Sequence, residues 1–176
     1  MGPARCAVIL VAAGLLTSCG GHARHRPVVC VPSARAVLAA QLGVPVSEVS
    51  QAVSTGNNGM PQCVLTARRA GTPPVQVTVN LDNGPQPYFR LERTAVEASQ
   101  QFGTQRLYAA PDQIMGLGLD ADWFPASNYL ETSDGRKLII VTIGWPRSSQ
   151  AQRRALSIGI ARRFLGRLRH NPNAGY

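Results

Sequence analysis

The densest group of side chains that could do chemistry is a set of three aspartates, Asp112, Asp120 and Asp122. Hard cations such as Ca²⁺ prefer carboxylate oxygens, and several of these in one loop can hold such an ion. A calcium loop of the EF-hand type needs more acidic residues at fixed spacing and a closing glutamate. We therefore expect capping or solvated carboxylates and no bound metal. A metal-dependent hydrolase using the three aspartates is a less favoured alternative.

Activated nucleophiles are not indicated either, because a serine, threonine or cysteine nucleophile needs a base beside it. The three histidines lie towards the ends of the chain, at His22, His25 and His170. Gly116 and Gly118 lack the third glycine and the Lys-Ser/Thr pair of a phosphate-binding loop, so we expect them to form a tight turn. The sequence predicts no enzyme, no catalytic residue and no cofactor.

The start of the chain has the features of a bacterial export signal. One positive charge precedes an unbroken apolar run over residues 6–16. This run has the length of a signal sequence and is too short for a bilayer-spanning helix, which needs about 20 residues. It ends in Leu16-Thr17-Ser18-Cys19, where one aliphatic and two small residues precede a cysteine. We expect cleavage before Cys19 and a lipid on its sulfur, with ordinary secretion as the alternative.

Two of the four cysteines, Cys30 and Cys63, remain after signal removal and lipidation. Disulfides persist outside the membrane, so we predict a bond between these two residues. In the chain-entropy model, a disulfide that closes the loop between Cys30 and Cys63 stabilises the fold by roughly 3 to 4 kcal/mol. A metal site is the competing interpretation, but two cysteines without a histidine in the core fall short of the usual four ligands.

Basic residues outnumber acidic ones by 18 to 9, and the end of the sequence is especially basic. No acidic residue follows Asp134, whereas nine cations do. A candidate patch for an anionic ligand lies on the last predicted helix and comprises Arg153, Arg154, Arg162, Arg163 and Arg167. These arginines scatter on a helical wheel, which favours a solvated surface over a dedicated face. Outside the cell the anionic partner would be a lipid headgroup, a wall polymer or an acidic protein, not nucleic acid.

Helices and strands must position these residues. Helical spacing predicts helices over residues 34–42, 88–102 and 149–171, the last beginning with a Ser149–Gln152 capping box. Strand patterns cover residues 49–54, 62–68, 75–81, 129–132 and 137–145, the last two joined by an Asp134-Gly135 hairpin. This order predicts an α+β fold with a mostly antiparallel sheet and helices packed on one face.

The predicted organisation is a signal peptide over residues 1–18, a flexible tether over 19–28, one globular α+β domain over 29–171 and a tail over 172–176. Trp123 and Phe124 follow the paired glycines directly. We expect these aromatic side chains either to anchor their segment in the core or to line a pocket.

Motifs along most of the chain resemble the actinobacterial family of small, mycobacterial-type envelope lipoproteins that carry a domain of unknown function. The residues that carry the resemblance are the lipobox ending at Cys19, Cys30 before a helix closing in Leu42-Gly43, Cys63 at the start of a strand, Met115-Gly116-Leu117-Gly118 leading to Ala121 and Trp123, the Asp134-Gly135 hairpin and the Ala/Leu-rich last helix. The resemblance implies a secreted, non-catalytic module with its two domain cysteines paired.

The expected function is therefore a lipid-anchored protein on the extracytoplasmic face of the cell membrane. We expect it to bind an envelope protein or an anionic or lipidic ligand without catalysis. A structural or assembly role without any ligand is the main alternative. That role predicts a surface without a pocket and places Trp123, Phe124 and Trp145 in the core.

Overall fold

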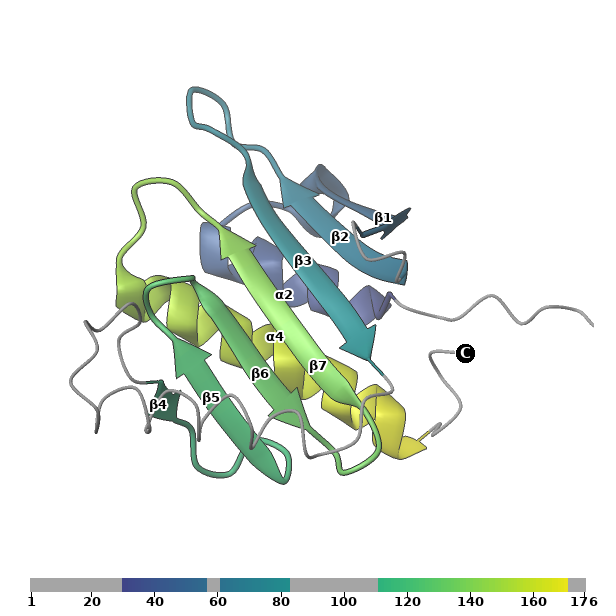
Figure 1. Ribbon diagram of the computed structural model, residues 1–176. Helices are drawn as coiled ribbons and strands as arrows, with labels where there is room; N and C mark the ends of the chain where they lie inside the picture. The colour runs from purple at the N-terminus through teal and green to yellow at the C-terminus, as the bar shows by residue number, and fades with distance from the viewer. Residues whose placement is uncertain (1–29, 57–60, 83–110, 171–176) are drawn as a thin grey trace, which may run out of the picture.

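The computed structural model describes residues 30–56, 61–82 and 111–170. These residues form a seven-stranded antiparallel sheet in the order β1-β2-β3-β7-β6-β5-β4, with two α-helices on one face (Figure 1). The predicted α+β fold is confirmed. The following predictions lie outside the described residues: the signal peptide, Cys19, the tether with His22 and His25, the helix over residues 88–102 and the tail.

Helix α2 covers Pro32–Leu42, close to the predicted helix. Proline suits the first position because the N–H that it lacks would have no partner within the helix. The helix ends at Gly43, whose φ of 67° lies in the left-handed region that glycine adopts readily. Ala34 and Leu38 are fully buried in the hydrophobic core. A short 3₁₀ turn, η1 (Val46–Glu48), leads into the first strand.

Three antiparallel strands follow, β1 (Val49–Thr55), β2 (Pro61–Ala67) and β3 (Val75–Asp82). β3 has the alternation that the sequence predicts, because every second residue of a strand points to the same face. Its three buried side chains are Val75, Val77 and Val79. They point to the face that the helices cover, and the polar residues between them point away.

The predicted hairpin is confirmed as β6 (Tyr129–Ser133) and β7 (Leu138–Gly144). The carboxylate of Asp134 closes the turn by accepting hydrogen bonds from the backbone N–H groups of Arg136 and Lys137, at 2.9 and 2.8 Å. β7 lies between β3 and β6 and is therefore central, as its run of Leu, Ile and Val predicts.

Two further strands were not predicted, β4 (Asp112–Gln113) and β5 (Asp120–Phe124). β5 pairs with β6 along its whole length, and β4 closes this edge of the sheet. Ala121, Asp122 and Trp123 are all buried, so β5 is covered on both faces. The aspartates that suggest a cation loop thus belong to strands.

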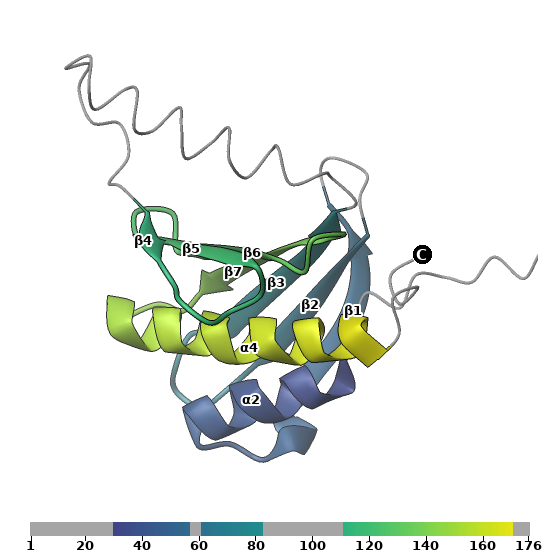
Figure 2. The same ribbon diagram turned by 90° about the horizontal axis from the view of Figure 1, so that it is seen from below.

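Helix α4 covers Gln150–His170 and packs beside α2 on the same face of the sheet (Figure 2). The predicted capping box is present, because the Ser149 backbone N–H donates to Gln152 Oε1 at 2.8 Å and the Gln152 N–H donates to Ser149 Oγ at 3.2 Å. The buried face of α4 includes Leu156 and Phe164, whereas Ala151 and Ala155, which share their helical spacing with later apolar residues, are exposed. Alanine is a poor marker of a buried face because its side chain is small.

The Cys30–Cys63 disulfide is present, with the two Cα atoms 5.0 Å apart. This separation lies within the range that a disulfide can bridge. The bond fastens the entrance of α2 to β2, and Cys63 is completely buried. The structure thereby confirms the cysteine pairing.

Candidate functional site

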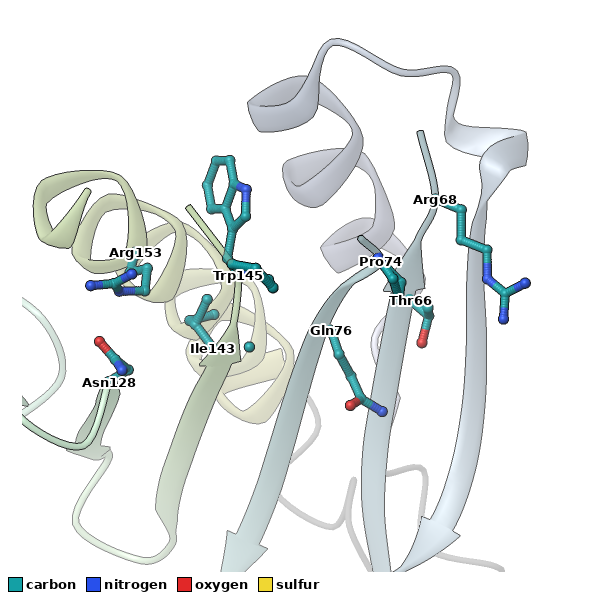
Figure 3. Close-up of a pocket in the computed structure, with 10 residues that line it drawn as sticks. Thr66, Arg68, Pro74, Gln76, Asn128, Ile143, Trp145 and Arg153 are labelled. Carbon is teal, nitrogen blue, oxygen red and sulfur yellow. The ribbon is translucent and has the colours of Figure 1, made fainter. Parts of the chain in front are cut away.

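A hollow of about 530 Å³ lies at the end of the sheet where β7 passes into α4 (Figure 3). We call it the β7–α4 hollow. It is lined by residues from β2, β3, β7, α4 and the turns beside them: Thr66, Arg68, Pro74, Gln76, Asn128, Ile143, Gly144, Trp145, Pro146 and Arg153. Among the described residues, the lining contains two arginines and no acidic residue. This composition suits an anionic group, since guanidinium groups bind carboxylates and phosphates through paired hydrogen bonds.

Strand register explains how the floor of the hollow forms. Thr66 on β2 pairs with Gln76 on β3, which pairs with Gly144 on β7, so the three positions form one row across the sheet. Glycine contributes no side chain to this row. A Cβ atom at Gly144 would meet the Gln76 carbonyl oxygen at 3.6 Å and the Gln76 Cβ atom at 3.9 Å, both ordinary contact distances. The space above Gly144 thus exists because the side chain is missing, and a larger residue would enter it.

Two polar atoms of the lining, the donor Arg153 Nε and the acceptor Asn128 Oδ1, are buried and have no hydrogen-bond partner within the part of the chain that the structure describes. Both side chains lie on the same side of the hollow (Figure 3). Arg153 is held in place by its Nη1 group, which donates to the carbonyl oxygen of Ser148 at 2.8 Å and to its hydroxyl at 3.2 Å. Buried polar atoms are normally paired, so these two mark a place where a ligand or water would supply the partners.

Trp145 forms an apolar wall of the hollow and is half-buried, packed partly against the core. It opens a turn whose next residue, Pro146, has its φ fixed by the ring. The turn closes when the Ser148 backbone N–H donates to the Trp145 carbonyl oxygen at 3.4 Å, which the Ser148 hydroxyl also contacts at 2.7 Å. The hollow therefore combines cationic, amide and aromatic surface.

Arg147, the third residue of this turn, has a φ of 62°, in the region that favours glycine. Its side chain is exposed. Replacement by glycine, Arg147→Gly, is expected to raise the free energy of unfolding by about 0.5–1 kcal/mol, because the left-handed backbone costs an L-residue more than the added chain entropy of glycine. Denaturant unfolding of the two proteins measures this difference.

Asn128, with a φ of 55°, provides the matched control for Arg147→Gly. Asparagine tolerates the left-handed region far better than arginine, so Asn128→Gly should leave the stability nearly unchanged. A loss of stability in Arg147→Gly would contradict the prediction and show that the arginine side chain makes contacts that outweigh the strain.

The three aspartates of the candidate metal site do not converge. Asp112 lies directly opposite Trp123 in the β4–β5 pair, which places their side chains on the same face. Asp120 and Asp122 alternate with Trp123 along β5 and lie on the other face. Across residues 30–56, 61–82 and 111–170, no three acidic, histidine or cysteine side chains are grouped to hold a metal ion. The carboxylate of Asp122 is buried opposite Glu131, and both groups have interaction partners.

The five arginines of the candidate anionic patch are not brought together. Arg153 and Arg154 are half-buried in the first turns of α4, whereas the other three, Arg162, Arg163 and Arg167, are exposed further along. At 1.5 Å per residue, Arg153 and Arg167 are about 21 Å apart along the helix. Only Arg153 of the five lines the β7–α4 hollow.

The two aromatic residues expected in the core or in a pocket lie away from the β7–α4 hollow. Trp123 is completely buried in the core, and Phe124 is half-buried and stacked on Tyr129, with ring centroids 4.4 Å apart. The aromatic wall comes from Trp145, which was not among the predicted pocket residues and was expected in the core only under the alternative structural role. The sequence offered one signal for this position, because Trp145 directly follows a strand and precedes Pro146. A residue there lies at the end of the sheet, outside the strand pairing.

Comparison of the chain with protein-family models, with curated proteins and with solved structures found no match. The resemblance to actinobacterial envelope lipoproteins therefore stays a prediction from the motifs alone. Within the part of the chain that the structure describes, no helix has both the length and the apolar character needed to cross a bilayer.

Proposed function

We propose that this protein is a lipid-anchored, extracytoplasmic binding protein that holds a small anionic ligand in the β7–α4 hollow and performs no catalysis. The observation that carries the proposal is the composition of that hollow, which among the described residues has two arginines, no acidic residue and one buried donor without a partner, the Arg153 Nε–H. Trp145 and Pro74 add apolar surface beside the cations. The favoured ligand thus carries a carboxylate or phosphate next to a flat or aliphatic part.

Binding is best measured with phenyl phosphate and inorganic phosphate as probes, using tryptophan fluorescence of the full-length protein in detergent. The chain has two tryptophans, and only Trp145 is at the hollow, whereas Trp123 is fully buried. We expect a saturable change with phenyl phosphate, and weaker binding of inorganic phosphate because it cannot use the apolar wall. A structural role without ligand predicts no response to any anion.

Replacing the half-buried cation, Arg153→Gln, is expected to weaken phenyl phosphate binding by about 10-fold to 100-fold, because a hydrogen bond to a charged group contributes about 1.5–3 kcal/mol. Arg162→Gln is the matched control, since it removes the same charge from an exposed position of α4 outside the hollow. Equal effects of the two variants would contradict a site at Arg153 and indicate unspecific attraction by the net charge.

A steric variant tests the same site without changing its charge. Gly144→Leu places a side chain in the hollow and is expected to abolish saturable binding. The control Gly144→Ala should bind nearly as well as the original protein, because its Cβ atom fits at an ordinary contact distance. Unchanged binding in Gly144→Leu would exclude the β7–α4 hollow as the site.

The lipid anchor is tested separately on protein isolated from native membranes. Mass spectrometry of the N-terminal peptide is expected to find Cys19 as the first residue with acyl chains attached. The support for this comes from the signal-like run and the small residues before Cys19. An intact, unlipidated N-terminus would refute anchoring but would leave the ligand site untouched.

A further inference from the structure

The loop over residues 115–119, between β4 and β5, carries the most exposed large apolar side chains of the described chain. Met115 and Leu119 are 82 % and 68 % exposed, whereas Leu117 between them is 2 % exposed. An isolated apolar residue on a surface is ordinary, but two on one short loop around a buried anchor form a local apolar tip.

This tip is held in a fixed shape. The Thr132 hydroxyl donates to the Leu117 carbonyl oxygen at 3.1 Å, and the Leu119 backbone N–H donates to the Ser133 carbonyl oxygen at 2.8 Å. Gly116 and Gly118 both have positive φ, which confirms the predicted tight turn. The loop therefore presents Met115 and Leu119 as a preformed surface.

Two arginines lie beside the tip, on the side of α4 and the β6–β7 turn. A second hollow, of about 360 Å³, separates the loop from the end of α4 and is lined by Gly118, Leu119, Asp134, Arg136, Leu168 and Arg169. Arg136 and Arg169 are exposed. The carboxylate of Asp134 accepts two backbone hydrogen bonds in its own turn. Two exposed arginines thus lie beside an apolar loop, and Asp134, the one carboxylate that the described residues contribute to this lining, is engaged in closing the hairpin.

Lys137 adds no exposed charge to this end, because its side chain is buried. Burial lowers the pKa of the Lys137 ammonium, and the nearby Asp134 carboxylate opposes this in part. The exposed positive charge here accordingly comes from arginine, which stays charged in proteins.

The chain enters the described structure at the same end of the sheet. β3 ends at this end because Asp82 pairs with Leu138, the first residue of β7, and Cys63 lies near the start of the antiparallel β2. The disulfide holds Cys30 there. Figure 2 shows the start of α2 and the end of α4 on the same side of the molecule. The β7–α4 hollow lies at the other end of the sheet.

We infer that the apolar loop with Arg136 and Arg169 docks on a bilayer surface that contains anionic phospholipid. Met115 and Leu119 enter the boundary between headgroups and acyl chains, and the two arginines contact lipid phosphates. The inference rests on the proposed anchor for the tether: residues 19–29 reach at most about 40 Å, so a lipid on Cys19 holds the domain within this distance of the membrane. The β7–α4 hollow then faces away from the bilayer.

Amide hydrogen exchange of the full-length protein tests the inference on two kinds of vesicle, phosphatidylcholine alone and phosphatidylcholine with about one third phosphatidylglycerol. We expect amides of residues 115–119 and 134–137 to exchange at least 10-fold more slowly on the anionic vesicles. Amides around Gly144 and Trp145, at the other end, should not change. Equal exchange on both vesicles overturns the inference.

Two pairs of variants separate the apolar and the cationic contributions. Leu119→Asp should abolish the protection, whereas Val46→Asp, which changes another exposed apolar residue, in η1 at the other end of the sheet, should not. Arg136→Gln should reduce the protection at least 3-fold more than Arg162→Gln. Protection that appears only after an envelope protein extract is added would identify a protein partner and overturn docking to lipid.

Separate readouts keep failure of this inference distinct from failure of the proposed function. Flotation with phosphatidylcholine vesicles reports the lipid anchor, and Trp145 fluorescence reports the ligand hollow. Protein that does not float with neutral vesicles but is protected on anionic ones would dock without an anchor, which supports the inference. Protein that floats but shows no protected amides would have an anchor and no docking face, which overturns it.

Discussion

Removing the disulfide by the double replacement Cys30→Ala and Cys63→Ala is expected to lower the free energy of unfolding by about 3–4 kcal/mol. The bond closes a loop between residues 33 positions apart, and in the chain-entropy model a loop of this length restricts the unfolded chain by about that amount. Marginal stability of about 5–15 kcal/mol is typical of a domain, so this is a large share. Urea unfolding monitored by circular dichroism measures the change.

Reductant supplies the control for the double replacement. Dithiothreitol should destabilise the original protein by a similar amount and leave the double variant unchanged. A loss below about 1 kcal/mol would mean that the unfolded chain is already compact around these two positions, since the stabilisation acts through the unfolded state. The single variants are less informative because each leaves one reactive thiol.

Adding one methyl group at position 118, Gly118→Ala, is expected to cost about 2–4 kcal/mol. Gly118 has a φ of 69°, and its Cβ atom would overlap the Ser133 carbonyl oxygen and the Thr132 hydroxyl. The carbonyl belongs to the backbone of β6, so relief requires the loop to move off the sheet edge. Overpacking of this kind typically costs 1–3 kcal/mol, and the left-handed conformation adds about 1 kcal/mol.

Gly116 is a matched control two residues away. Its φ of 74° carries the same conformational cost, but a Cβ atom there meets nothing within 4 Å. Gly116→Ala should therefore cost only about 1 kcal/mol. Equal losses in the two variants, measured by thermal or denaturant unfolding, would contradict a specific close approach at Gly118.

The elements that the sequence predicts well have strong local signals. Alternating valines in β3, the Asp134-Gly135 turn and the Ser149–Gln152 capping box each depend on residues close in the chain. The cysteine pairing also followed, because counting left only two candidates. These features needed no knowledge of distant contacts.

β5 was missed although its sequence alternates. Asp120 and Asp122 were considered as possible cation ligands in a loop. They alternate with Ala121 and Trp123, whose side chains lie on the other face, and this alternation was not recognised as a strand pattern. Carboxylates seldom sit at buried strand positions, because burying a charge is costly unless it has partners. Asp122 is such an exception, and its partners lie elsewhere in the chain.

The β7–α4 hollow could not be predicted from spacing in the sequence. Its lining comes from the end of β2, the start of β3, the turn before β6 and the start of α4, and these segments meet only through sheet register. Arg153 was a candidate for a different reason, as one of five arginines on a helix. The structure separates it from the others because its guanidinium is fixed by Ser148.

The pairing of β3 with β7 also determines in which order the molecule can fold. Strands β1 to β3 and both disulfide cysteines lie within residues 30–82, so this half can form its local hairpins and its cross-link as soon as it emerges. β3 must then wait for residues 138–144, with one edge unpaired, before the sheet is complete. Asp82 and Leu138 pair although they are far apart in the chain, and bringing them together costs conformational entropy. We therefore expect the β3–β7 pairing to limit the folding rate, and the molecule to be most prone to aggregation before this pairing forms.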